Sequence, residues 1–190
     1  MDKVQTRLTS AELRRFRDLP ENAHRRFELR YGEIVEMPSP SVLHQWIVAE
    51  LLFMLKAFLR ENPIGYAFGD NLDYEPTDGI VVQPDVSFVS FERAPILPKE
   101  WKIMPDLAVE IMSPSNRESD MLTKVQLYFA YETRLVWVVY PDERMVRVYT
   151  PAVNGVHVRQ LLEGETLDGG TVLPNFTAEV KNILPKPENT

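Results

Sequence analysis

Two acidic residues interrupt segments that are otherwise apolar, and they are the strongest candidates for chemistry in this chain. Asp85 lies within the apolar segment 81–89, and Glu110 lies within the segment 107–112. A lone ionised carboxylate in a buried strand costs several kcal/mol unless it is paired, protonated or bound to a metal. On neighbouring strands the two could share one Mg²⁺ or Mn²⁺ ion, because these cations prefer oxygen ligands. We therefore expect the carboxylate oxygens of Asp85 and Glu110 to lie within about 6 Å of each other.

A purely structural role remains open for both acids. Each could end a strand, where a carboxylate accepts backbone N–H bonds or pairs with an arginine. A glycosidase that uses the two acids as proton donor and base is disfavoured, because Phe88 and Trp101 are too few aromatic residues to stack sugars.

Other common kinds of catalytic or binding site are excluded by residue type and spacing. The chain has no cysteine, which removes disulfides, thiolate metal sites and cysteine nucleophiles. Its eight glycines do not form a dinucleotide-binding or phosphate-binding loop. The histidines at 24, 44 and 157 are too scattered to indicate a zinc cluster. A site built from carboxylates is what remains.

The charge of the chain limits its partners. A formal net charge of −7 and a pI near 5.1 argue against a broad electropositive face of the kind that binds nucleic acid. Acidic residues clustered in one cleft would lower the net charge while a local basic rim still met phosphates. Candidates for such a rim are Arg25, Arg26, Arg30 and Arg117.

Hydrophobic periodicity and turn residues predict a mixed α/β chain. Helices are expected at residues 11–17, 42–60 and 120–132. Strands are expected at 27–30 and 33–37 (a hairpin around Gly32), 65–68, 71–74, 81–89, 106–112 and 135–140, with a terminal meander at 145–150, 156–161 and 171–173. Residues 90–105 read as a surface excursion. This order predicts an α+β mixed sheet with helices packed on it, in one domain spanning 1–190 with an N-terminal extension at 1–20 and a tail at 185–190.

The acidic pair resembles a known nuclease signature. Pro84-Asp85 followed by Glu110-Ile-Met is similar to the PD-(D/E)XK motif, in which Asp and Glu hold a metal and Lys assists the attacking water. The whole chain is similar to the Uma-two family of small endonucleases. The blocks that carry this likeness are FELRYGEIVEM at 27–37, PSPSVLH at 38–44, QPDVSFV at 83–89, PDLAVEIMSPS at 105–115, and the helix with Lys124 and Tyr128. The resemblance implies a restriction endonuclease-like fold and Mg²⁺ or Mn²⁺ held by Asp85, Glu110 and the carbonyl of Ile111.

One position departs from the motif. Two residues after Glu110, where the signature has lysine, the chain has Met112. The resemblance implies that Lys124, on the following helix, supplies the missing ammonium group. Helical spacing places Asp120 and Tyr128 on the same face as Lys124. The apolar stripe of this helix is expected at Leu122, Val125 and Phe129.

The same resemblance gives roles to two further residues. Glu33 would be a third acidic ligand or a general base, and His44 would contact a phosphate or water. From spacing alone, Glu33 reads as an exposed hairpin residue and His44 as a side chain covering the core. Asp106 and Glu36 remain as surface candidates.

Together these features predict a metal-dependent nuclease acting on nucleic acid, with DNA as the expected substrate. A non-catalytic binding or assembly module of the same fold is the alternative, favoured by the acidic pI and by Met112. Apolar strands near the C-terminus, with Trp137 and Tyr140, suggest a homodimer. The N-terminal residues lack a signal-peptide core, which suggests a cytoplasmic protein. The apolar stretch 46–59 is too short to span a bilayer, so no membrane partner is expected.

Overall fold

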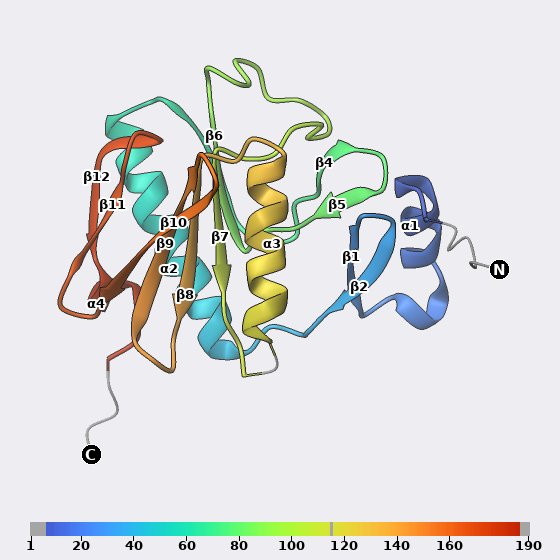
Figure 1. The fold of residues 1–190 in the computed structure, drawn as a ribbon, viewed down its shortest axis with the longest axis horizontal. Helices are drawn as coiled ribbons and strands as arrows, with labels where there is room; N and C mark the ends of the chain where they lie inside the picture. The colour runs from blue at the N-terminus through green and yellow to red at the C-terminus, as the bar shows by residue number, and fades with distance from the viewer. Residues whose placement is uncertain (1–6, 115, 187–190) are drawn as a thin grey trace.

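The structure is a computed structural model that describes residues 7–114 and 116–186 (Figure 1). Within these residues the helices are α1 (Ser10–Arg17), the 3-10 helix η1 (Pro20–Asn22), α2 (Val42–Glu61), α3 (Glu118–Ala130) and α4 (Val180–Ile183). The strands are β1 (Arg26–Arg30), β2 (Glu33–Met37), β3 (Gly65–Phe68), β4 (Tyr74–Thr77), β5 (Ile80–Val82), β6 (Val86–Ser90), β7 (Leu107–Ile111), β8 (Leu135–Tyr140), β9 (Met145–Ala152), β10 (Gly155–Leu162), β11 (Thr166–Gly169) and β12 (Leu173–Glu179). The predicted mixed α/β class is confirmed.

A six-stranded mixed sheet forms the centre of the molecule. Its order is β10-β9-β8-β7-β6-β3, and the β7–β8 pair is parallel while its other pairs are antiparallel. A parallel pair needs a crossover connection, and α3 provides it. Alternation along β7 sends Leu107, Val109 and Ile111 to one face of the sheet and Ala108 to the other. Glu110 therefore points to the face that α3 covers.

The two faces of this sheet are covered by different elements. On the face of Val109, α2, α4 and the two-stranded β11–β12 sheet form the larger core, in which Trp137 stacks on Phe176. On the opposite face, α3 packs through Val125 and Tyr128. In Figure 1, α3 lies between the six-stranded sheet and the β1–β2 hairpin. This position lets one helix contact both.

A second sheet carries the N-terminal part of the site. Its order is β2-β1-β5-β4, and α1 packs on it through Leu13, with Phe16 edge-on to Phe27. A capping box begins α1: the Thr9 hydroxyl accepts from the Glu12 N–H, and the Glu12 carboxylate accepts from the Thr9 N–H. These contacts anchor the β1–β2 hairpin.

The strand expected at 81–89 is two strands in two different sheets, β5 and β6. The break falls at residues 83–85, where Pro84 has no N–H to donate to a sheet ladder. Asp85 comes directly before β6; its N–H donates to the carbonyl of Val109, and its side chain accepts from the N–H of Ile111.

Other sequence expectations also need correction. The strand expected at 71–74 is β4, three residues later; of the strand expected at 171–173, residues 171 and 172 form a turn and Leu173 begins β12. Trp137 and Tyr140 are buried within the subunit, so they cannot form the dimer surface assigned to them. The apolar stripe of α3 is misplaced at Leu122, which is 38% exposed.

Helix α2 extends one residue beyond the helix expected at 42–60. With 20 residues it is longer than the apolar stretch 46–59, on which the expectation of no membrane span rests. Among the described residues it is the helix that passes a length and composition test for crossing a membrane, with 28% of its most apolar window buried. The core helix of a soluble protein passes the same test, so this is weak evidence for a membrane.

Candidate active site

Most of the residues predicted to do chemistry line one cavity of about 670 Å³. Its walls are the β1–β2 hairpin, the segment leading into α2, the facing ends of β6 and β7, and the first half of α3. Five predicted site residues line it: His44, Asp85, Glu110, Ile111 and Lys124. Elements that are far apart in sequence therefore meet where the resemblance places an active site.

Asp85 is fixed by the strand beside it. Val86 is opposite Val109 in the antiparallel β6–β7 register, so Asp85 comes next to Glu110. The N–H of Ile111 donates to Asp85 Oδ2 at 2.8 Å, and His44 Nε2 lies 3.1 Å from Oδ1. Burial lowers the pKa of His44, but the hydrogen bond and charge of Asp85 outweigh it and raise this pKa above its ordinary value. The two acids thus lie on adjacent segments, with Glu110 in β7 and Asp85 directly before β6.

Glu110 is buried in the middle of the sheet. Its Oε1 accepts from the Tyr128 hydroxyl at 2.6 Å and lies 2.8 Å from Lys124 Nζ. Burial is the main cause that raises the pKa of Glu110 to about 7; Lys124 opposes it, and the nearby charges of Asp85 and Glu28 add to it. Burial and two neighbouring acids thus disfavour the ionised form of Glu110, and Lys124 favours it.

Lys124 occupies the space between two buried carboxylates. It is 1% exposed, and its Nζ lies 2.9 Å from Glu28 Oε1 as well as 2.8 Å from Glu110. Burial lowers the pKa of Lys124, but Glu110 and Glu28 more than offset this and raise it. Lys124 therefore stays protonated, although it lies in the protein interior.

Glu28 is a site residue that sequence reasoning missed. It is fully buried at the centre of β1 and also accepts from the Gln83 N–H at 2.8 Å and from Arg30 Nε at 2.8 Å. Burial opposes ionisation of Glu28, but Lys124 and Arg30 hold its pKa at about 2. The signal was present, since Glu28 interrupts the apolar pair Phe27 and Leu29 as Asp85 and Glu110 interrupt their segments.

The structure also shows where Glu33, Asp106 and Glu36 lie. Glu33 is exposed at the turn end of the hairpin and is not among the residues that line the cavity, although Arg30, opposite it in the strand pair, is. The structure therefore does not bring Glu33 together with the other predicted site residues. Asp106 is not a surface residue: it is fully buried and holds Arg134 Nη2 at 2.8 Å. Glu36 is exposed at the cavity wall, as expected.

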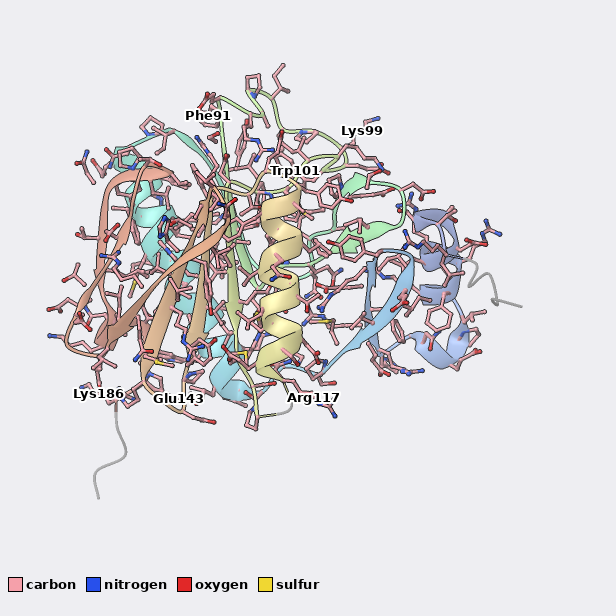
Figure 2. All side chains as sticks on the ribbon, in the orientation of Figure 1. Phe91, Lys99, Trp101, Arg117, Glu143 and Lys186 are labelled. Atoms are coloured by element: carbon pink, nitrogen blue, oxygen red, sulfur yellow. The ribbon has the colours of Figure 1, made fainter. Side chains whose placement is uncertain are left out.

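The predicted arginine rim is present. Arg25, Arg26, Arg30 and Arg117 all line the cavity, together with His24. Three of these arginines already pair within the chain: Arg25 with Glu36, Arg26 with Asp70, and Arg30 with Glu28. Figure 2 shows Arg117 at the N-terminal end of α3. The net charge of −7 therefore coexists with a local basic wall.

The donor atoms of the cavity fit a hard divalent cation. Among the described residues there is no group of three or more His, Asp or Glu side chains arranged to hold a metal. Asp85 and Glu110, with the Ile111 carbonyl, supply fewer ligands than a dedicated protein cage. Mg²⁺ commonly binds in this way, through one or two carboxylates with water and substrate phosphate completing its coordination. A cation would also relieve the charge deficit at Glu110.

Comparison with known proteins bears on the fold and the family of the chain. No curated protein matches the chain. A solved structure titled "a putative nuclease belonging to DUF820", from Anabaena variabilis ATCC 29413, is 23% identical, with a TM-score of 0.76 over 90% of this chain and 96% of that one. This likeness supports the fold. Residues 13–181 match the model of the family Uma2, "Putative restriction endonuclease", and the chain therefore belongs to the Uma2 family.

Proposed function

We propose that the protein is a metal-dependent nuclease that hydrolyses phosphodiester bonds, with DNA as its first expected substrate. The observation that carries this proposal is the meeting of two buried carboxylates, Asp85 and Glu110, with a buried ammonium group, Lys124, at one cavity. Family membership supports a nuclease-like function. We also propose that the protein acts in the cytoplasm.

Each residue has a separate task in this proposal. A divalent cation held by Asp85, Glu110 and the Ile111 carbonyl would activate water and neutralise charge on the phosphate. Lys124 stabilises the charge that develops on the phosphate oxygens as water adds to phosphorus and the ester P–O bond breaks. Glu28 positions Lys124, and His44 positions Asp85. Both positioning groups are themselves buried, which limits reorganisation during the reaction.

Arg117 is expected to bind substrate without acting in the chemical step. It lines the cavity wall at the N-cap position of α3, where its side chain makes no capping hydrogen bond, so it can meet a phosphate beside the scissile one. Arg117→Ala should raise KM several-fold with kcat nearly unchanged. It should also reduce the steepness of the plot of log affinity against log salt concentration by about one unit. The control is Arg159→Ala, which removes an arginine that pairs with Asp168 away from the cavity. Equal effects of the two variants would contradict a role for Arg117.

Tyr128 is expected to set the pH at which Glu110 becomes ionised. Its hydroxyl donates to the carboxylate, which favours the charged form, so Tyr128→Phe should raise the pKa of Glu110 further above about 7. Because the proposed reaction needs ionised Glu110, activity is lost as pH falls through this pKa. The midpoint of the pH–rate profile should move up by about half to one unit.

The matched control for this prediction is Tyr140→Phe. Tyr140 also donates to a glutamate, Glu118, but neither residue lines the cavity. A profile that is unchanged in Tyr128→Phe, or that moves equally in Tyr140→Phe, would show that Tyr128 does not tune Glu110.

A non-catalytic binding module remains the second candidate, and one observation favours it. His44 already pairs with Asp85, and Lys124 already pairs with Glu110, so the carboxylates have partners within the chain. In a module of this kind the ionic cluster would be structural, and arginines of the rim would contact the partner.

A cleavage assay tests the proposal. Single-stranded DNA, duplex DNA and RNA are incubated with the protein in Mg²⁺, in Mn²⁺ and in a chelator. The proposal expects cleavage of at least one substrate that depends on the cation and is lost in Glu110→Gln. Binding of nucleic acid without cleavage under every condition would favour the second candidate.

A further inference from the structure

Helix α2 carries an exposed stripe of apolar side chains. Its opposite face, with Ile47, Leu51 and Leu55, is buried against the six-stranded sheet. The exposed positions are Val42 (90%), Trp46 (40%) and Phe53 (68%), with the exposed residues Ala49 and Ala57 on the same line. Steps of three and four residues keep such positions on one face of a helix. An exposed aromatic stripe of this kind indicates an interaction surface.

The stripe is symmetric in sequence about Phe53. Ala49 and Ala57 lie four residues before and after Phe53, and Trp46 and Arg60 lie seven residues before and after it. The alanines would let two backbones approach closely. A guanidinium group is a favourable partner for the face of a tryptophan ring. The stripe is therefore complementary to a reversed copy of itself.

The charges of α2 favour the same arrangement. Glu50 lies in the first half of the helix, whereas Lys56, Arg60 and Glu61 lie in the second half, where two cations outnumber one acid. No ion pair is described for these four residues in residues 7–114 and 116–186. Two copies in parallel would bring Lys56 near Lys56 and Arg60 near Arg60. Two antiparallel copies instead place the cationic half of each helix against the half with Trp46 and Glu50.

We propose that two copies of this chain associate through α2, antiparallel, with a two-fold axis at Phe53. Phe53 contacts Phe53 of the second copy, and Arg60 covers Trp46 of the second copy. An interface of this kind is isologous, so each contact occurs twice. This surface replaces the one expected from Trp137 and Tyr140, and it does not depend on nuclease activity.

The arrangement has a consequence for the cavities. Ser41 caps α2 and His44 lies in its first turn, and both line the cavity. Antiparallel pairing puts the two copies of His44 at opposite ends of the helix pair, roughly 27 Å apart along its axis at 1.5 Å per residue. The dimer would therefore hold two separate sites.

Sedimentation velocity tests whether the surface joins two copies. Over about 1 to 100 µM the wild type should pass from monomer to dimer. Phe53→Glu places two carboxylates at the axis and should weaken association at least about tenfold. Leu122→Glu, a matched change at an exposed leucine of α3, should have no effect. Far-ultraviolet circular dichroism checks that each variant is folded.

Single-cysteine variants test the antiparallel geometry, because the chain has no cysteine of its own. Under mild oxidation Phe53→Cys should form a disulfide-linked dimer. Val42→Cys should not, because antiparallel pairing separates its two copies by roughly 33 Å along the axis. Cross-linking of both variants would overturn the antiparallel arrangement in favour of a parallel one.

Three other outcomes would overturn the proposal. The first is a wild type that stays monomeric over the whole range. The second is a dimer disrupted by Val158→Glu, on the exposed edge strand β10, and insensitive to Phe53→Glu. The third is a monomer that sediments with neutral phosphatidylcholine vesicles and loses this property in Phe53→Glu, which would assign the stripe to a lipid surface.

Discussion

Replacement of Lys124 by methionine is expected to lower the free energy of unfolding by about 3–5 kcal/mol, the usual effect of removing one partner of a buried ion pair. Methionine keeps most of the length of the side chain, so the loss comes from charge. Glu28 and Glu110 are 0% and 3% exposed, and without Lys124 they face each other across a space with low dielectric. Arg30 still pairs with Glu28, which leaves Glu110 as the unpaired group.

Urea unfolding at neutral pH measures this loss. Lys181→Met is the control, because Lys181 pairs with Glu179 at the surface, where an ion pair contributes at most about 1 kcal/mol. The double variant Glu110→Gln with Lys124→Met should recover part of the stability, since it removes the unpaired charge. If Lys124→Met is no less stable than Lys181→Met, the ionic cluster does not hold the site together.

The second large effect is expected from Asp85→Asn and Glu110→Gln. Each should lower the cleavage rate by roughly 10³-fold or more, because loss of a metal ligand removes several kcal/mol of transition-state stabilisation. Each should also abolish stabilisation by Mn²⁺. The amides keep the shape of the acids, and in Asp85→Asn the side-chain amide oxygen can still accept from the Ile111 N–H, so the fold should persist.

Glu163→Gln is the control for these two variants, because Glu163 pairs with Arg144 outside the cavity. It should leave both the rate and the response to Mn²⁺ unchanged. A variant of Asp85 or Glu110 that cleaves as fast as this control would remove that residue from the site.

The acidic pair could be predicted from sequence because its signal is local. A carboxylate within an apolar segment is visible in a few residues, and alternation along a strand fixes which face it takes. The break at 83–85 was missed, although Pro84 marked it, because both sides of the break are apolar enough for one long strand. That break decides how Asp85 meets its neighbours.

The rest of the cluster depends on tertiary contacts that no local pattern encodes. Glu28 contacts Lys124 because the β1–β2 hairpin lies beside α3 in the fold. The residues near Glu28 in the sequence do not indicate that Lys124 is its partner. The resemblance alone assigns a site role to Glu33, which does not line the cavity. Lys124 itself was found only through the resemblance, because an isolated lysine on a helix usually reads as exposed.

The most direct test of the metal site is the melting temperature of the wild-type protein with and without Mn²⁺, at a pH above 7 where Glu110 is ionised. A ligand at 100 times its Kd stabilises the native state by about 2.7 kcal/mol, which corresponds to a rise of roughly 5–10 °C for a chain of this size. We predict a saturable rise of this order in the wild type, with none in Glu110→Gln. A wild type whose melting temperature does not respond to Mn²⁺ or Mg²⁺ would contradict a metal site at Asp85 and Glu110.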